Sequence, residues 1–345
     1  MIIVTGGSGK VGRACVRDLM EHGYKVLSLD MVRPTGMSNP PRPSDPTFSV
    51  CDITDFGQVM AALSGVDDRH EGEKVEAIVH LGAIAAPGQA QDQVIFDTNM
   101  ISTHNVFEAA RRLGIRNLVW ASSETVYGIP YAKGPAYVPV DEEIEAPQSS
   151  YSLSKLMGEK LAVEFAKWDP KAKIVGLRFS NVMEPQDYEN FPGYQGDARL
   201  RRFNLWTYID ARDAAQAIRK AVEVKLTGAH VFGIANSNSL MSRSNDELLD
   251  EVFPGTRRKR KLKPNESLIS IEKAQRVLGY KPQHDWSAGK VRAPRLEKTP
   301  PRIVTEALAA KTTGGKVRAP RIVKSPPKLV TDQLRKPGGT GAPKR

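Results

Sequence analysis

Short apolar runs alternate with amphipathic stretches over the first 180 residues of the chain. Residues 1–5 are apolar and rich in β-branched side chains, which indicates a buried strand, and residues 11–21 place their apolar side chains on one helical face. The same periodicities predict strands at 25–29, 47–51, 75–81, 115–121 and 173–178, and helices at 56–63, 91–113 and 151–168. Strands that alternate with helices predict a doubly wound parallel sheet, an α/β fold.

A glycine-rich turn joins the first strand to the first helix. Gly6, Gly9 and Gly12 have the spacing GxxGxxG. In this setting the first glycine permits the turn, the second lets a phosphate approach the backbone, and the third lets helix and strand pack closely. The amides at the helix N-terminus then face the anion. We therefore predict that this turn binds the pyrophosphate of a dinucleotide.

Acidic residues follow the next two predicted strands. Asp30 lies 18 positions after Gly12, where a carboxylate accepts hydrogen bonds from ribose hydroxyls and repels a 2'-phosphate. This favours NAD over NADP, although Arg33 just beyond could meet a phosphate. Asp52 could meet the adenine amino group, and the competing role for this region is a helix cap by Thr54 or Asp55. We assign His80, an isolated histidine at a strand end, to packing.

Residues suited to acid/base chemistry follow the fifth predicted strand. Ser122 and Ser123 come directly after it, and Tyr151 and Lys155 open a later helix, four positions apart and therefore on one face. A tyrosine is a poor base at its unperturbed pKa of ~10, but a neighbouring ammonium favours the phenolate. The phenolate can then take a proton from a substrate hydroxyl that a serine positions, and the lysine can also hold the nicotinamide ribose.

Motifs in chain order resemble the extended short-chain dehydrogenase/reductase superfamily, in its NAD-dependent epimerase/dehydratase branch. Within residues 1–186 they are TGGSGKVG, the Asp30 strand end, CDITD, HLGA, TNMISTHNVFEAA, SSETVYG, PQSSYSLSK and LRFSNVMEP. The resemblance implies a Rossmann fold, NAD as cofactor, and a sugar or nucleotide-sugar substrate. It implies Ser123 as the hydroxyl partner, Tyr151 as acid/base and Lys155 as its modulator. It also implies a homodimer that pairs through helices 91–113 and 151–168.

The resemblance extends to the residues around both ligands. The implied cofactor contacts are Gly6, Gly9, Lys10, Val11, Gly12, Asp30, Asp52, Ile53, Leu81, Gly82, Ala83, Asn99, Ser122, Tyr151 and Lys155. The predicted substrate contacts are Ser123, Glu124, Thr125, Asn181, Arg199, Arg201 and Arg202. Sugar dehydratases of this family have Asp-Glu where this chain has Glu124 and Thr125. The second carboxylate is missing, which disfavours expulsion of water, whereas epimerisation of UDP-sugars remains possible.

The segment 181–208 is short and contains several arginines. Nucleotide-sugar epimerases have a longer stretch here, and the shortened layout resembles uronate dehydrogenases. Arginine binds carboxylate bidentately, so a free sugar acid is the alternative substrate, and a solvated basic loop is the alternative role. Beyond it we predict a helix at 211–224, a strand at 229–234, small helices at 246–253 and 270–278, and a closing LGYKP motif at 278–282.

Charge separates the end of the chain from the rest. The net charge is +11, but residues 288–345 carry +12, so the remainder is nearly neutral. This tail repeats GKVRAPR after 26 residues and contains no aromatic residue. We predict that it is disordered and binds polyanions weakly without reading nucleic-acid sequence. We therefore divide the chain into a cofactor domain at 1–180, a substrate-binding region at 181–287 interleaved with the end of the sheet, and the tail.

Composition narrows the remaining possibilities. The two cysteines lack metal-ligand and redox spacing, and nothing resembles a signal peptide or membrane span. We expect a cytoplasmic protein with reduced thiols, no metal and no membrane partner. Three function classes remain: an NAD-dependent sugar epimerase or dehydrogenase, a catalytically silent NAD-binding regulatory protein whose tail binds polyanions, and a nucleic-acid-associated protein with an enzyme-like body. The intact Ser, Tyr and Lys set favours the first.

Overall fold

The computed structural model describes residues 1–34, 37–38, 42, 45–65 and 73–287. The chain divides into a unit at Met1–Pro294 and a second unit at Arg295–Arg345. The predictions made for the tail at 288–345 lie outside the described residues.

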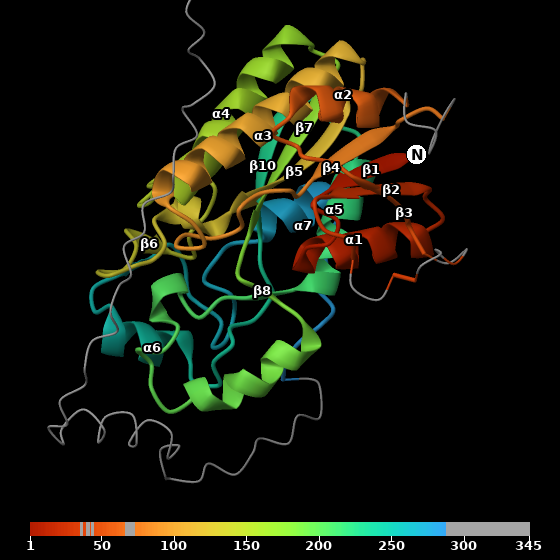
Figure 1. The fold of residues 1–345 in the computed structure, drawn as a ribbon. Coiled ribbons are helices and arrows are strands. Elements are labelled where there is room, and N and C mark those ends of the chain that lie inside the picture. Colours follow the sequence, from red (N-terminus) through yellow and green to blue (C-terminus); the bar gives the residue numbers. More distant parts are fainter. Residues whose placement is uncertain (35–36, 39–41, 43–44, 66–72, 288–345) are drawn as a thin grey trace, which may run out of the picture. The chain divides into compact units, whose positions relative to one another are not determined.

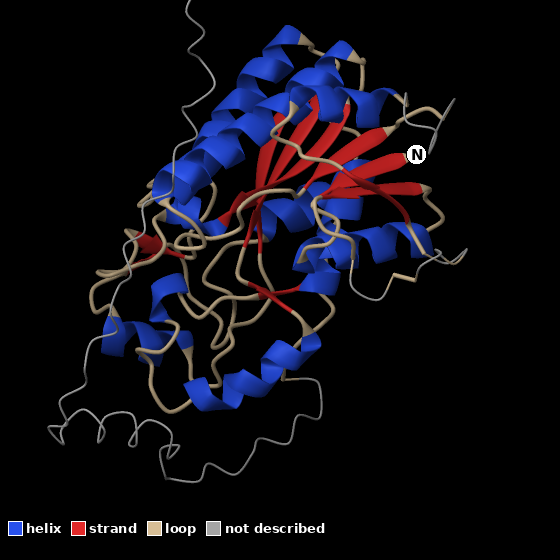
Figure 2. Ribbon diagram, viewed as in Figure 1, coloured by secondary structure: helices blue, strands red, loops and turns tan. Residues whose placement is uncertain are grey.

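A seven-stranded parallel sheet forms the centre of the first unit, and it confirms the predicted doubly wound fold (Figures 1 and 2). Its strands lie in the order β10-β7-β5-β4-β1-β2-β3. The bounds are β1 Ile2–Thr5, β2 Val26–Asp30, β3 Thr47–Val50, β4 Ala77–His80, β5 Asn117–Ser123, β7 Lys173–Phe179 and β10 Gly228–Ile234. The chain reverses its direction of travel across the sheet between β1 and β4, and ligands bind at such a point in open α/β sheets.

Helices cover both faces of the sheet (Figure 1). One face carries α2 (Phe56–Ser64), α3 (Asp92–Arg112) and α4 (Ser150–Trp168), and the other carries α1 (Lys10–Glu21) and α5 (Ala211–Glu223). Alternation along β1 explains the two layers, because Ile2 and Val4 belong to one buried cluster and Ile3 to the other. The parallel strands are therefore apolar on both faces.

Side chains at the helix starts explain where several helices begin. The carboxylate of Asp55 accepts from the amide of Gln58 and begins α2, which settles the competing cap roles predicted for this region. Ser149 forms a capping box with Ser152 and begins α4, and Asp210 caps α5. The cap of α4 matters for the site, because Tyr151 lies in the first turn of that helix.

The region 181–287, together with residues 137–138, adds short elements that periodicity did not predict. They are β8 (Val182–Met183), paired with β9 (Ile209–Asp210), and β6 (Tyr137–Val138), paired with β11 (Arg257–Arg258). Two 3-10 helices, η2 (Pro185–Tyr194) and η3 (Arg202–Asn204), lie among them, and the predicted small helices appear as α6 (Asn245–Val252) and α7 (Glu272–Leu278). Two-residue strands carry no readable period, which explains why they were missed.

One boundary differs where the chemistry lies. We predicted that the fifth strand ends at Ala121, but β5 continues to Ser123 because it pairs with β7 as far as Ser123 opposite Phe179. Ser122 and Ser123 are therefore held by the sheet. Across the described part of the chain, the helices are too short or too polar to cross a membrane.

Candidate active site

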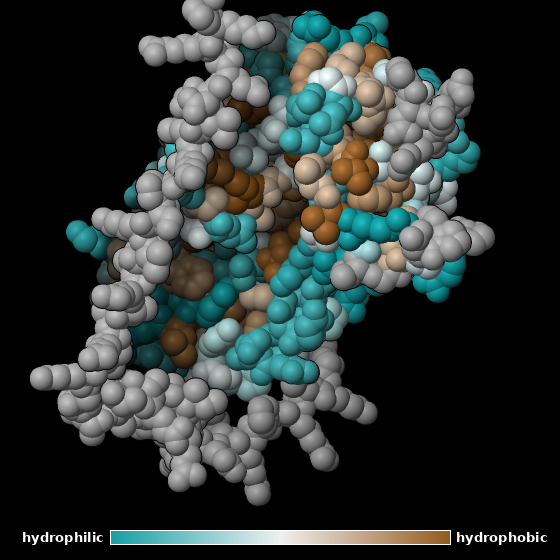
Figure 3. All heavy atoms as spheres, viewed as in Figure 1, coloured by the Kyte–Doolittle hydropathy of each residue, from teal (hydrophilic) through white to brown (hydrophobic). Residues whose placement is uncertain are grey.

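A cavity of about 870 Å³ opens at the carboxyl ends of the central strands. This face of the molecule is hollowed at its centre, and hydrophobic residues gather in the hollow (Figure 3). Most of the predicted site residues line the cavity: Gly6, Gly9, Lys10, Val11, Gly12, Asp30, Asp52, Ile53, Leu81, Gly82, Ala83, Ser122, Ser123, Glu124, Thr125, Tyr151, Lys155 and Asn181. The predicted residues outside its lining are Asn99, Arg199, Arg201 and Arg202.

The glycine-rich turn packs backbone against backbone. Gly6 has a φ of +71°, and a Cβ added there would lie 2.5 Å from the amide nitrogen of Gly82. A Cβ on Gly12 would overlap the carbonyl oxygen of Gly6. Gly9 is the N-cap of α1, and no side chain of the described residues caps that helix. The first amides of α1 are thus free for an anion, so the turn fits a pyrophosphate group.

Asp30 is held at the end of β2 by backbone donors. Its carboxylate accepts from the amide of Ser8 at 3.0 Å and from the amide of Val32 at 3.2 Å. The side chain therefore lies beside the glycine-rich turn, where a dinucleotide ribose would follow the pyrophosphate. The guanidinium of Arg33 instead donates to the carbonyl of Ser38 at 3.1 Å. This arrangement fits a ribose with free hydroxyls better than a 2'-phosphate.

Asp52 and Ile53 form a second part of the cofactor end. The Asp52 carboxylate accepts from the amide and hydroxyl of Thr54, at 2.9 and 2.7 Å. Asn105 of α3 donates to the carbonyls of Ile53 and Thr54, at 3.2 and 2.9 Å, and so fixes this turn. Asn105 received no role from its sequence, because its partners Ile53 and Thr54 lie 52 and 51 residues away along the chain.

The end of β4 is fixed by two buried polar side chains. His80 contacts the hydroxyl of Thr5 at 2.8 Å, and burial, with the charge of Lys155 adding to it, lowers its pKa to about 3. A neutral, buried histidine in this place has the packing role that we expected. Asn99 accepts from the amide of Ile84 at 2.9 Å and donates to its carbonyl at 3.1 Å. Asn99 thus holds the loop that lines the cavity.

The acid/base residues meet where β5 ends and α4 begins. The ammonium of Lys155 donates to the carbonyl of Ala121 at 2.9 Å and lies 5.7 Å from the centre of the Tyr151 ring. Burial lowers the pKa of Lys155 to about 8. Burial also raises the pKa of Tyr151 to about 12, against a hydrogen bond from Ser123. Burial is thus the largest influence on this pKa, and it disfavours the phenolate.

A buried ion pair supports this helix from behind. Glu159 lies on α4 one four-residue step beyond Lys155 and two beyond Tyr151. Its carboxylate binds the guanidinium of Arg178 through two hydrogen bonds of 2.8 and 2.7 Å and accepts from Ser122 at 2.6 Å. The hydroxyl of Ser122, predicted as a cofactor contact, therefore faces this pair. Sequence reasoning missed Glu159, although its spacing from Lys155 was a usable signal.

The predicted substrate residues separate into two groups. Arg201 donates to the side chain of Asn181 at 3.0 Å, and its guanidinium lies 4.9 Å from the centre of the Phe203 ring. Asn181 and Phe203 both line the cavity, so Arg201 lies directly behind its wall. Arg199 instead approaches Asp197 at 3.8 Å and Glu251 at 3.9 Å, away from that wall. We predicted the same substrate role for Arg199 and Arg201, but their contacts in the structure differ.

Two ion pairs join the start of α1 to the start of η2. Lys10 pairs with Asp187 at 2.7 Å, and Arg13 pairs with Glu184 at 2.9 Å. Lys10 therefore lines the cavity while it is bound to a segment more than 170 residues away. No sequence pattern indicated these partners.

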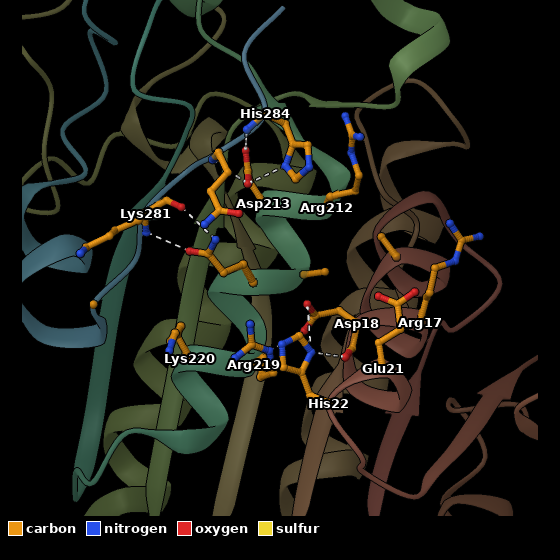
Figure 4. A pocket seen from close by; sticks show the side chains of 15 residues that line it. Arg17, Asp18, Glu21, His22, Arg212, Asp213, Arg219, Lys220, Lys281 and His284 are labelled. Atoms are coloured by element: carbon orange, nitrogen blue, oxygen red, sulfur yellow. Dashed lines mark hydrogen bonds and ion pairs between the residues drawn. The ribbon is translucent and has the colours of Figure 1, made fainter. Parts of the chain in front are cut away.

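A second cavity, of about 680 Å³, lies between α1, α5 and residues 279–284 (Figure 4). None of the predicted site residues lines it. Two of its acidic side chains have basic partners: Asp18 pairs with Arg219 at 2.8 Å, and Asp213 pairs with His284 at 2.9 Å. The first contact joins α1 to α5, and hydrogen bonds between Gln216 and Lys281 hold the LGYKP segment against α5. We therefore assign this cavity to packing.

Comparisons with known proteins agree with this geometry. A model of the NAD dependent epimerase/dehydratase family matches residues 2–235. The chain is 27% identical over 192 residues to a bifunctional UDP-glucose 4-epimerase and UDP-xylose 4-epimerase of Arabidopsis thaliana, a match that covers 52% of this chain and 51% of the plant protein. The chain thus spans about half the length of this and several other curated relatives that it matches.

Two further likenesses cover more of the chain. A putative UDP-glucose 4-epimerase of Methanocaldococcus jannaschii is 28% identical over 321 residues, which cover 84% of this chain and 95% of that protein. The solved structure of UDP-glucose 4-epimerase from Thermotoga maritima, with UDP-glucose, aligns with a TM-score of 0.61 at 22% identity. That alignment covers 84% of this chain and 95% of the solved one, and it shows a shared fold.

Proposed function

The chain belongs to the NAD dependent epimerase/dehydratase family, and from this premise we propose that it is an NAD-dependent epimerase or oxidoreductase of a sugar or nucleotide-sugar. The observation that carries the proposal is the position of Ser123, Tyr151 and Lys155. They line the same cavity as the glycine-rich turn and Asp30. A reacting hydroxyl and a dinucleotide can therefore meet in one enclosed space.

The cofactor end fits NAD. The free amides of α1 would bind the pyrophosphate, Asp30 would accept from the ribose hydroxyls, and Asp52 with Ile53 would hold the adenine. Lys155 lies close enough to Tyr151 to hold the second ribose and the tyrosine together. When bound, NAD supplies a hydride acceptor.

The chain's own residues handle the proton. Ser123 hydrogen-bonds the substrate hydroxyl and keeps it beside Tyr151, whose phenolate accepts the proton. The phenolate forms only when positive charge offsets the burial of Tyr151, which raises its pKa to about 12. Lys155 supplies such charge from the next turn of α4, and its contact with the carbonyl of Ala121 keeps the ammonium in place.

The relatives that match the chain are UDP-glucose 4-epimerases by name, which supports a nucleotide-sugar substrate. One observation favours a free sugar acid as the second candidate. Arg201 lies behind the cavity wall at the short 181–208 segment, and its Nε is buried without a hydrogen-bond partner among the described residues. A carboxylate is the group that such a guanidinium edge binds best.

The test is incubation of the full-length protein with NAD and a matched panel of UDP-glucose, UDP-galactose, glucuronate and glucose. A dehydrogenase accumulates NADH in step with substrate loss, whereas an epimerase interconverts the UDP-sugars without net NADH. NAD binding with no turnover of any panel member would favour the silent regulatory protein. The presence of Ser123, Tyr151 and Lys155 in one cavity argues against that outcome.

We further propose a homodimer formed through α3 and α4. These adjacent helices expose large apolar side chains that a solvated surface does not favour: Val94, Ile101, Leu153, Met157, Val163 and Trp168. Leu153→Asp should place a charge in the pairing face and halve the mass measured by sedimentation. An unchanged mass for this variant would place the contact elsewhere.

The basic tail supports a third, separate proposal, namely weak binding to polyanions. Its charge of +12 is suited to phosphate neutralisation, which predicts affinity that falls steeply with salt. Cutting after Ala288 should abolish heparin or RNA retention while NAD affinity and turnover stay near their original values. A large rise in KM for an acidic sugar would instead give the tail a role in the substrate site.

A further inference from the structure

Glu124 is a carboxylate in the cavity wall to which the proposed chemistry gives no step. It follows Ser123 directly, lines the cavity, and is only 6% exposed. Carboxylates that are this deeply buried are rare unless they are paired or serve a function.

Three neutral donors from distant segments converge on Glu124. Its Oε2 accepts from the hydroxyl of Ser180 at 2.8 Å and from that of Thr207 at 3.3 Å. Its Oε1 accepts from the side-chain amide of Asn204 at 3.2 Å. The contacts fasten the 201–207 loop to the end of β5. In that loop Arg201, Leu205 and Trp206 adopt left-handed backbone conformations, with φ of 63°, 58° and 55°. Such strain persists only where surrounding contacts hold it.

The charged and titratable groups that face Glu124 are Arg201, Tyr151 and Tyr131. Burial raises the pKa of Glu124 to about 7, against the hydrogen bonds from Ser180 and Asn204 and the charge of Arg201. The ionised carboxylate in turn raises the pKa of Tyr151, because it disfavours a second negative charge nearby. Glu124 and Tyr151 line one cavity, and the ammonium of Lys155, 5.7 Å from the centre of the Tyr151 ring, is the positive charge on the other side of the tyrosine.

We propose that Glu124 is a positioning residue that tunes the acid/base tyrosine: its charge, balanced by Arg201, sets the pH range over which Tyr151 can take a proton. The proposal rests on the role of Tyr151 in the proposed function. Glu124 acts through Tyr151 and need not touch the substrate. The reacting hydroxyl loses its proton more easily when Glu124 is neutral than when it is ionised.

The sign of the effect distinguishes this role from a structural one. Glu124→Gln keeps the shape of the side chain and removes the negative charge, so the phenolate of Tyr151 should form at lower pH. The amide oxygen can still accept from Asn204, and the amide nitrogen would donate to the Ser180 and Thr207 hydroxyls, which can turn to accept. Arg201→Met removes the balancing positive charge, so the phenolate should form at higher pH. A residue that only braces the loop would move both variants in the same direction, through loss of order around Tyr151.

The experiment follows phenolate absorbance of the full-length protein with saturating NAD as the pH rises. Subtracting the titration of Tyr151→Phe isolates Tyr151. We expect a midpoint about one pH unit lower in Glu124→Gln, and a higher midpoint in Arg201→Met. The control is Glu145→Gln, which removes an exposed carboxylate paired with Lys160 of α4 at 2.6 Å and should leave the midpoint in place.

An unchanged midpoint in Glu124→Gln, or shifts of the same sign in Glu124→Gln and Arg201→Met, would overturn the proposal. If Glu124→Gln fails to fold, the direction of the Arg201→Met shift still decides whether charge at this place controls Tyr151. The titration needs no substrate. Absence of turnover on every sugar would therefore count against the proposed function and leave this measurement valid.

Discussion

The two ends of the cavity are built from different parts of the polypeptide. The cofactor end is mostly backbone: Gly6, Gly12 and Gly82 pack so closely that an added Cβ would collide. The substrate end is mostly side chains, with Glu124 joined to Ser180, Asn204 and Thr207 over a span of 83 residues. Cofactor binding should therefore be lost when an atom is added at the first end, and turnover should be lost when an atom is removed at the second.

The largest expected effect is on turnover, and it comes from removal of one oxygen at the substrate end of the cavity. Tyr151→Phe keeps the ring and deletes the acid/base hydroxyl, so turnover should fall by about two powers of ten or more while NAD affinity survives. Steady-state rates and equilibrium NAD binding measure the two quantities separately. If the variant keeps its activity, Tyr151 transfers no proton, and the reaction does not depend on this side-chain oxygen.

Addition of one carbon at the cofactor end should come next. Gly12→Ala forces a Cβ against the backbone of Gly6 and Gly7, which cannot move as a side chain could. We expect a loss of about 1–3 kcal/mol in stability or NAD affinity. Gly193→Ala is the control, because a Cβ there meets open space. If Gly12→Ala and Gly193→Ala had equal NAD affinities and equal melting temperatures, the glycine-rich turn would tolerate the added Cβ.

Acid should lower the free energy of unfolding through His80, at the end of β4. Burial lowers the pKa of His80 to about 3, from a model-compound value of 6.5. The unfolded chain therefore takes up a proton that the folded chain refuses. His80 has no effect on the free energy of unfolding above pH 6.5 and lowers it by about 1.4 kcal/mol per pH unit as the pH falls from 6.5 towards 3.

Urea unfolding at pH 7 and pH 5 measures this slope. His80→Gln should flatten it, whereas His104→Gln, at an exposed position on α3, should keep it. A slope unchanged by His80→Gln would mean that carboxylates alone account for acid unfolding.

The smallest effect should come from Asp30, a side-chain contact at the cofactor end. Asp30→Ala removes the acceptor for the ribose hydroxyls and the charge that repels a 2'-phosphate. The preference for NAD over NADP should narrow by about tenfold, as measured by the two dissociation constants. Tighter binding of NADP by the unmodified protein would show that Arg33 dominates.

The amino-acid sequence alone was enough to predict the features that depend on local geometry. Glycine spacing, apolar periodicity and the four-residue step from Tyr151 to Lys155 are local patterns, and local geometry converts them directly into a turn, strands and one helical face. The glycine-rich turn, Asp30 and the acid/base residues could therefore be located without a structure, and they do line one cavity.

Only the tertiary structure decided which side chains meet across long stretches of sequence. It brought Lys10 to Asp187, joined Glu124 to Asn204, and separated Arg201 behind the cavity wall from Arg199 at Glu251. None of these pairs has a period or a spacing, because each contact depends on how whole elements pack. For the same reason the pKa of Tyr151 could not be predicted from the four-residue spacing to Lys155, because burial, which raises this pKa most, is a property of the fold.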